Sequence, residues 1–125
     1  MPIMKTRRII FSCIRLDAHI GILEHERLET QPIHVDAEID VDVTQSVDDN
    51  DIGTVLDYRA LHDAIVQECT RGHVNLLETL TEQLANRLLT LFAETSSVKL
   101  RITKPSAFAD SVGVAIEVLV HRDSN

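Results

Sequence analysis

The sequence predicts an α+β domain with the element order ββααββ, in which a four-stranded antiparallel sheet carries two helices on one face. Two observations predict this class. Apolar and polar residues alternate in the first and last parts of the chain, as in strands with one buried face, and between those parts the apolar spacing becomes helical. The 125 residues suffice for one hydrophobic core, so we expect a single domain over residues 1–125.

The N-terminal part of the chain predicts a long antiparallel hairpin. Residues 8–18 are rich in β-branched and aromatic side chains, which favour a strand. Gly21 then indicates a turn or a place where another group approaches the backbone closely, and a polar connection follows up to Gln31 and Pro32. Residues 33–43 alternate strictly between apolar side chains and polar ones, most of them acidic, so one face of this strand is expected to be buried and the other solvated.

Two amphipathic helices are predicted in the middle of the chain. An acidic, turn-rich loop at residues 46–53 comes first. The apolar stripe of the first helix runs from Tyr58 to Cys69, and Arg71-Gly72 ends this helix. The second helix is expected from about Leu76, with leucines at helical spacing along its inner face.

The C-terminal part predicts a second hairpin. Residues 98–103 alternate, and Pro105 ends this strand because proline has no N–H to donate. Residues 112–120 alternate again after a loop at 105–110. A four-stranded sheet of this kind would leave two long edge strands without partners. These edges would disappear if the edge strands of neighbouring subunits paired with each other and closed a barrel. We therefore expect a ring-shaped homo-oligomer.

The charge balance excludes several classes of partner. Lys and Arg number 12 and Asp and Glu number 20, which gives a net charge of −8 spread along the chain. A nucleic acid or an anionic membrane surface would require a basic face, so neither is expected as a partner. No apolar stretch is long enough for a membrane span, and the N-terminal residues lack a signal-peptide pattern. The two distant cysteines indicate free thiols, and we expect a cytoplasmic protein.

Four side chains near predicted turns are candidates for chemistry: Glu26, Tyr58, Glu78 and Lys104. Each also has an ordinary structural explanation. Lys104 could be an exposed lysine at a strand end, Glu26 part of a solvated charged segment, and Tyr58 the first core residue of its helix. Glu78 could close a capping box with Asn75 as the N-cap residue. The histidines are scattered without the spacing of metal ligands, so no metal site is expected.

Several short motifs together resemble the dihydroneopterin aldolases. In order, they are residues 20–27 (Ile-Gly-Ile-Leu-Glu-His-Glu-Arg) with Gln31, residues 55–58 (Val-Leu-Asp-Tyr), residues 75–80 (Asn-Leu-Leu-Glu-Thr-Leu), residues 102–105 (Ile-Thr-Lys-Pro) and residues 112–114 (Val-Gly-Val). The resemblance covers roughly residues 8–120. It implies the tunnelling fold, in which four subunits close a barrel and two such rings commonly stack into an octamer.

The same resemblance implies an activity. Members of this family are aldehyde-lyases of folate biosynthesis that split 7,8-dihydroneopterin into 6-hydroxymethyl-7,8-dihydropterin and glycolaldehyde. The C6=N5 imine of the pterin takes up the electrons of the broken bond, so no metal, no other cofactor and no Schiff base is implied.

The resemblance also implies which residues bind the pterin. The carboxylate of Glu78 would accept the paired N–H donors of the ring, and the N–H of Leu77, at a helix N-terminus, would bind the ring carbonyl. Leu56 and Val55 complete the implied substrate-binding set.

Three further residues are implied to be catalytic. Lys104 would act as a general base through ordered water, which requires a neutral amine favoured by burial or by nearby cations. Tyr58 would reach the pterin from a neighbouring subunit and take part in proton transfer. Glu26 would contact the polyol tail of the substrate.

Other segments resemble the dihydroneopterin triphosphate epimerase branch of this family, namely residues 57–59, 76–81 and 105–112. These enzymes invert the carbon that bears the 2′-hydroxyl, and the motif residues do not separate them from aldolases. We favour the aldolase because no cluster of Lys and Arg is evident that could receive a triphosphate. Arg27 and Arg59 are candidates for such a contact, but each is ordinary surface charge by default. A non-catalytic protein of the same fold that binds a pterin or purine is a third hypothesis.

Overall fold

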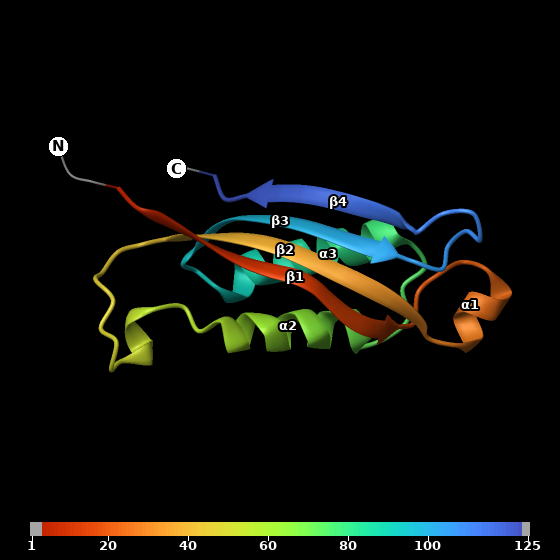
Figure 1. Ribbon diagram of the computed structural model, residues 1–125, viewed down its shortest axis with the longest axis horizontal. Coiled ribbons are helices and arrows are strands. Elements are labelled where there is room, and N and C mark those ends of the chain that lie inside the picture. Colours follow the sequence, from red (N-terminus) through yellow and green to blue (C-terminus); the bar gives the residue numbers. More distant parts are fainter. Residues whose placement is uncertain (1–3, 124–125) are drawn as a thin grey trace.

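The computed structural model describes residues 4–123 and has two layers, a sheet and a pair of helices (Figure 1). Its elements are β1 (Thr6–Ala18), α1 (Glu24–Leu28), β2 (Gln31–Asp42), the short 3₁₀ helix η1 (Ile52–Thr54), α2 (Tyr58–Thr70), α3 (Leu77–Leu91), β3 (Thr95–Lys104) and β4 (Val114–His121). The four strands and the two long helices follow the predicted order ββααββ, so the α+β class is confirmed.

The four strands form one antiparallel sheet in the order β1-β2-β3-β4. The strictly alternating strand β2 is central, and its apolar residues from Ile33 to Val41 are all buried. β1 and β4 are the edge strands, and their outer edges have no strand partner within residues 4–123. The long edges expected from the sequence are therefore present in the single chain.

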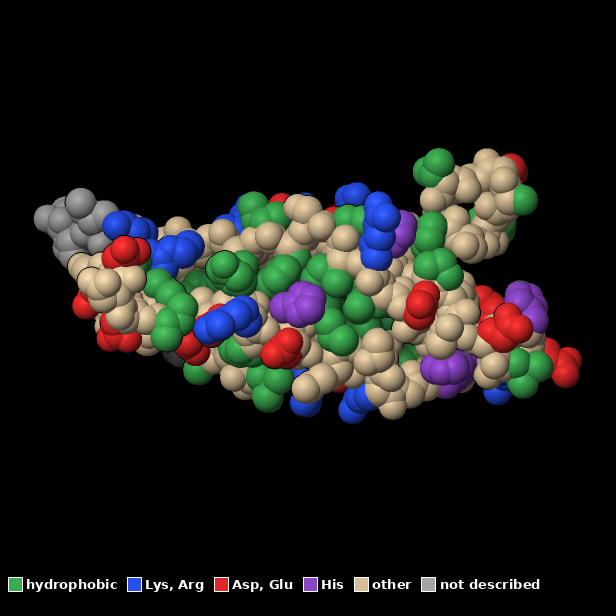
Figure 2. All heavy atoms as spheres, turned by 60° about the horizontal axis from the view of Figure 1, so that its bottom comes forward, with side chains coloured by type: hydrophobic (Ala, Val, Ile, Leu, Met, Phe, Trp, Pro, Cys, Tyr) green, Lys and Arg blue, Asp and Glu red, His purple; other side chains and the backbone are tan. Residues whose placement is uncertain are grey.

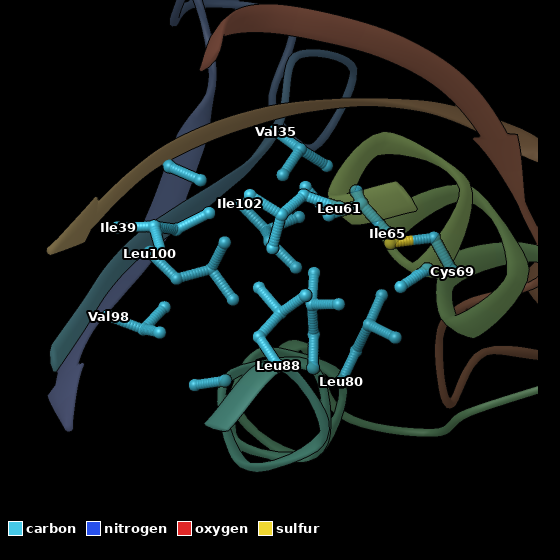
Figure 3. Close-up of a cluster of buried hydrophobic side chains, with 14 of the residues drawn as sticks. Val35, Ile39, Leu61, Ile65, Cys69, Leu80, Leu88, Val98, Leu100 and Ile102 are labelled. Carbon is cyan, nitrogen blue, oxygen red and sulfur yellow. The ribbon is translucent and has the colours of Figure 1, made fainter. Parts of the chain in front are cut away.

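Helices α2 and α3 cover one face of the sheet, and the core lies between the two layers (Figures 1 and 3). Leu80, Leu84 and Leu88 form the inner stripe of α3, as their helical spacing predicted, and they are almost completely buried. From the other layer, β3 contributes its alternating residues Val98, Leu100 and Ile102. Replacing one such leucine by alanine typically costs about 2–5 kcal/mol, so this core is a rigid base for the residues at its ends.

The packing places chain segments at two opposite ends of the molecule. The end of β3, the end of α2 and the start of α3 lie near α1, whereas η1 and the start of α2 lie at the far end (Figure 1). An isolated parallel bridge between Ile20 and Val74 joins the segment before α1 to the linker before α3. Residues far apart in the sequence thus meet at the α1 end.

The capping box that was the structural alternative for Glu78 does not form at the start of α3. The helix begins at Leu77, its N-cap residue is Leu76, and no side chain makes a cap hydrogen bond there. Asn75 therefore lies one residue too early, and Glu78 is the second helical residue rather than the third. Helix boundaries are the part of a sequence-based prediction that shifts most easily by one residue. The exposed carboxylate of Glu78 is consequently not used as a cap.

Two other boundaries also differ from the prediction. The polar connection at residues 24–29 contains the short helix α1 rather than a loop. β4 begins at Val114, and Val112 is an exposed loop residue, because Gly113 adopts φ = 145° and interrupts the alternation between them. The remaining alternate residues of β4 pair with β3 in the expected phase, with Ile116 opposite Ile102.

Candidate active site

Lys104 and Glu26 form an ion pair at the α1 end of the molecule. Lys104 is the last residue of β3, where pairing with Val114 of β4 fixes its backbone. Its Nζ atom lies 2.8 Å from Oε2 of Glu26, although the two residues are 78 positions apart in the sequence. The two side chains are only 16% and 12% exposed. The structure thus brings together two of the predicted catalytic residues in a largely desolvated contact.

The carboxylate of Glu26 accepts hydrogen bonds from three donors. Oε1 accepts the backbone N–H of Leu23 at 3.1 Å, and Oε2 accepts Nε2 of Gln31 at 3.0 Å in addition to Lys104. The hydrogen bond from Lys104, followed by that from Gln31, lowers the pKa of Glu26 from 4.5 to about 2, because each stabilises the anion. Glu26 is therefore a carboxylate at neutral pH and can accept hydrogen bonds but not donate a proton.

The backbone of Gly21 packs directly against this carboxylate. Its φ of +132° belongs to a region that side chains disfavour, and a Cβ atom at this position would overlap the carboxyl group of Glu26. The close approach to the backbone that the sequence indicated at Gly21 is confirmed, and the approaching group is Glu26. A glycine is therefore needed for Glu26 to reach Lys104.

A cavity of about 610 Å³ opens beside the ion pair. Figure 2 shows this end of the molecule hollowed between the protruding β3–β4 loop and α1. Besides Glu26 and Lys104, the lining comes from α1 and its flanks and from the β3–β4 loop, namely Ile22, Leu23, His25, Glu29, Thr30, Gln31, Ser106, Ala107, Phe108 and Val114. The cavity combines apolar walls with one charged pair, a composition typical of sites for small organic ligands.

Leu77 and Glu78 lie at the same end of the molecule, in the first turn of α3. The N–H groups of this turn have no intrahelical acceptor, and no side chain caps them. They can therefore donate to an oxygen atom of a ligand, and the exposed carboxylate of Glu78 can accept N–H groups beside them. Neither residue lines the cavity at Lys104. In one chain, Leu77 and Glu78 therefore lie at the same end as the Lys104–Glu26 pair but outside the cavity beside that pair.

Tyr58, Leu56 and Val55 lie at the opposite end. Tyr58 is the first residue of α2 and is 64% exposed. Val55 and Leu56 line a different, small cavity of about 70 Å³ together with residues of the β2–η1 loop. A single chain therefore does not bring these three predicted residues together with Glu26 and Lys104.

Lys104 is largely buried, with 16% of its side chain exposed, which is one of the two alternative conditions expected from the sequence. Its charged partner in the described structure is the carboxylate of Glu26 rather than a cation. No group of three or more His, Cys, Asp or Glu residues between positions 4 and 123 could hold a metal ion. Within the same residues, no helix is both long and apolar enough to span a bilayer.

Two residues of this site had no predicted role. Gln31 was part of a motif only, yet its amide Nε2 joins the carbonyl of Ile20, at 2.6 Å, to Oε2 of Glu26. His73 donates from the α2–α3 linker to the carbonyl of Gly21. Neither contact has a sequence pattern that could have indicated it, because each depends on how two loops fold against each other.

Comparison with known proteins agrees with this architecture. The family model of dihydroneopterin aldolase matches residues 9–117. A dihydroneopterin triphosphate 2'-epimerase of Pseudomonas aeruginosa is 30% identical over 118 residues, which cover 92% of this chain and 93% of the relative. A dihydroneopterin aldolase of Methylorubrum extorquens is 26% identical over 120 residues, covering 94% and 92% of the two chains.

Solved structures show the same fold. A structure from Vibrio cholerae assigned to the dihydroneopterin aldolases superposes with a TM-score of 0.86 at 24% identity, covering 93% of this chain and 98% of that one. A dihydroneopterin aldolase from Burkholderia thailandensis, bound to guanine, gives a TM-score of 0.82 at 27% identity and covers 94% and 93%. With the family model matching most of its length, this chain belongs to the dihydroneopterin aldolase family.

Proposed function

We propose that this protein is a dihydroneopterin aldolase that cleaves 7,8-dihydroneopterin into 6-hydroxymethyl-7,8-dihydropterin and glycolaldehyde, without a metal or a Schiff base. The observation that carries the proposal is the desolvated Lys104–Glu26 pair, which lies beside a cavity and at the same end as the uncapped first turn of α3. The guanine bound by the Burkholderia relative supports a ring-binding role, because guanine and a pterin present the same pyrimidinone edge.

The ring is proposed to bind at the first turn of α3. Glu78 would accept the two parallel N–H donors of the pyrimidinone edge, and the N–H of Leu77 would donate to the ring carbonyl. Since Glu78 is exposed and has no capping function, its carboxylate is available for this purpose. The polyol tail would then extend into the cavity at Lys104.

Cleavage requires that the 2′-hydroxyl of the tail loses its proton while the C1′–C2′ bond breaks. The bonding electrons move into the C6=N5 imine to give an enamine, C2′ leaves as the aldehyde carbon of glycolaldehyde, and C1′ is protonated afterwards. Glu26, which is anionic at neutral pH, would accept a hydrogen bond from a tail hydroxyl. Such a contact would compete with Lys104 for Oε2 of Glu26. The Nζ atom of Lys104 would then be free to exchange protons with ordered water, first as general base and afterwards as general acid.

The charges at the cavity favour a substrate without phosphate. Its lining contains one Lys or Arg side chain, Lys104, and two carboxylates, those of Glu26 and Glu29. Arg59, one of the two arginines that could receive a triphosphate, is paired with Asp57, with Nη2 2.7 Å from Oδ2. The described lining of the cavity therefore offers no cluster of Lys and Arg side chains that could bind a triphosphate tail.

The second candidate is the 2′-epimerase reaction, and the observation that favours it is the epimerase relative of Pseudomonas aeruginosa. Epimerisation would use the same bond cleavage, followed by re-addition of the aldehyde from its other face. Lys104 and Glu26 would keep the same roles.

We infer further that the complete site forms between subunits in the cytoplasm. Tyr58, Leu56 and Val55 line the opposite end of the chain from the end of β3, and the outer edges of β1 and β4, which have no strand partner within residues 4–123, allow chains to join side by side. A closed ring of four, stacked into an octamer, would bring the far end of one chain to the α1 end of the next and place Tyr58 beside the pterin. Light scattering tests this inference, and a monomer would contradict it.

Product analysis tests the reaction. The purified protein is incubated separately with 7,8-dihydroneopterin and with its triphosphate, and the pterins and aldehyde are identified by chromatography and mass spectrometry. Glycolaldehyde together with 6-hydroxymethyl-7,8-dihydropterin is the expected result. Inverted triphosphate without fragmentation would move the protein to the epimerase branch. No change in either substrate would refute both reactions and leave a binding protein.

A further inference from the structure

We propose that His73 is a positioning residue that holds the Glu26–Lys104 pair at a fixed place relative to the start of α3. His73 lies in the linker between α2 and α3, and its Nε2 atom is 3.0 Å from the carbonyl oxygen of Gly21. Because a carbonyl oxygen only accepts hydrogen bonds, Nε2 carries a proton and donates it. The proposal rests on the proposed function, since it concerns the same site.

The linker and the segment before α1 are held together by backbone hydrogen bonds. The N–H of Gly21 donates to the carbonyl of Val74 at 3.0 Å, and the N–H of Val74 donates to the carbonyl of His19 at 3.0 Å. These bonds fix the chain as far as the N–H of Gly21. The carbonyl of Gly21, where the chain turns toward α1, has no other hydrogen bond among residues 4–123 than the one from His73.

Gly21 transmits its position directly to Glu26. The backbone of Gly21 is so close to the carboxyl group of Glu26 that no Cβ fits between them. Gln31 adds a second connection, because its Nε2 binds both the carbonyl of Ile20 and Oε2 of Glu26. A shift of the Gly21 carbonyl would therefore move the Glu26 carboxylate away from Nζ of Lys104.

His73 also precedes Leu77 and Glu78 by only a few residues. The linker 73–76 leads straight into the first turn of α3, where the ring is proposed to bind. One side chain thus joins the part of the site that would hold the ring to the part that would act on the tail. Bond cleavage needs both parts at a fixed separation, whereas ring binding needs only the first, so loss of this link is expected to reduce turnover rather than ring affinity.

Three substitutions test this role: His73→Ala, His73→Gln and His73→Asn. The amide nitrogen of Gln can occupy about the place of Nε2, whereas the shorter Asn places its amide near Nδ1, which does not reach the Gly21 carbonyl. With 7,8-dihydroneopterin, we expect kcat to fall about tenfold in the Ala and Asn variants and to recover in the Gln variant. The dissociation constant for guanine, a probe of the ring site alone, should stay within about twofold in all three.

Hydrogen–deuterium exchange provides a readout that does not depend on catalysis. The N–H of Leu23 is bound by Oε1 of Glu26, so exchange of the segment 21–27 reports whether the carboxylate is in place. We expect faster exchange of this segment in His73→Ala and His73→Asn but not in His73→Gln, with the exchange of residues 79–90 of α3 unchanged.

The outcomes separate this proposal from the proposed function. A wild-type protein that cleaves neither pterin would refute the function, while the exchange of residues 21–27 would still decide the positioning role. Equal exchange in the wild type and in His73→Asn, or equal kcat in the Gln and Asn variants, would overturn the proposal. Because the Gln and Asn variants differ by one methylene group, their comparison remains decisive if His73→Ala does not fold.

Discussion

Replacing Glu26 by Gln tests the electrostatics of the site with little change in side-chain shape. In the wild type, all the hydrogen-bonding neighbours of this carboxylate are donors: the N–H of Leu23, Nε2 of Gln31 and Nζ of Lys104. A glutamine offers one oxygen and one NH₂ group, so its NH₂ must face at least one of these donors. Lys104 would at the same time lose its anionic partner where its side chain is only 16% exposed.

The size of the effect follows from the pKa of Glu26. Its lowering from 4.5 to about 2 corresponds to at most about 3–4 kcal/mol of favourable interaction with the anion. The remaining solvent contact weakens this interaction, so we expect Glu26→Gln to lower the free energy of unfolding by about 2 kcal/mol at pH 7.

The loss must depend on pH in a definite direction. The folded protein holds this carboxyl group with a lower pKa than the unfolded chain does, so the stabilisation is complete above about pH 4.5 and disappears as the pH falls toward 2. The difference between wild type and Glu26→Gln should therefore be constant from pH 8 to about pH 5 and shrink below about pH 4.5.

Urea unfolding measures this difference, at one protein concentration because association would shift the midpoint. Glu29→Gln is the matched control: Glu29 lines the same cavity but forms no ion pair in the described structure, so its removal should change the free energy by less than about 0.5 kcal/mol. Equal stability of Glu26→Gln and wild type at pH 7, or a difference that persists undiminished at pH 3, would refute the reasoning.

Three further substitutions test neighbouring parts of the account. Gly21→Ala should cost about 1–3 kcal/mol and reduce turnover, because φ of +132° disfavours a side chain and Cβ would displace Glu26; unchanged thermal unfolding and turnover would show that the backbone relaxes freely. Glu78→Ala should weaken guanine binding at least about tenfold in titration calorimetry, with a stability change below about 0.5 kcal/mol. Retained guanine affinity together with a loss of about 1 kcal/mol would instead point to a capping role. Lys104→Ala should lower kcat by about 10²-fold or more, and undiminished turnover would remove Lys104 from the chemistry.

The fold could be predicted from the sequence because, in each long helix or strand, the apolar residues recur at the spacing typical of that element. The alternation in β2 and the leucine spacing of α3 leave only one face of each element to bury, and the structure buries those faces. Shorter features contain too few residues for the spacing of apolar positions to be repeated. The five-residue helix α1 is too short for a helical period, and one residue decides whether Asn75 or Leu76 is the N-cap of α3.

The site could be predicted only as a set of residues. Positions near predicted turns made Glu26 and Lys104 candidates, family resemblance implied their roles, and the structure shows that they meet across 78 positions of sequence. Their contact depends on Gly21, Gln31 and His73, which act through loop geometry that no local pattern encodes. Tyr58 lies at the start of α2, at the opposite end of the chain from Lys104, so the proposed role of Tyr58 requires a second chain.

Mixing two inactive variants tests the central claim most directly, namely that Lys104 of one chain works with Tyr58 of the next. Lys104→Ala and Tyr58→Phe are unfolded together, refolded as a mixture, and assayed with 7,8-dihydroneopterin against each variant refolded alone. In randomly mixed rings, about a quarter of the sites would contain an intact lysine from one variant and an intact tyrosine from the other. We predict that the mixture regains up to about a quarter of the wild-type rate. A mixture no more active than the separate variants would contradict a site shared between subunits.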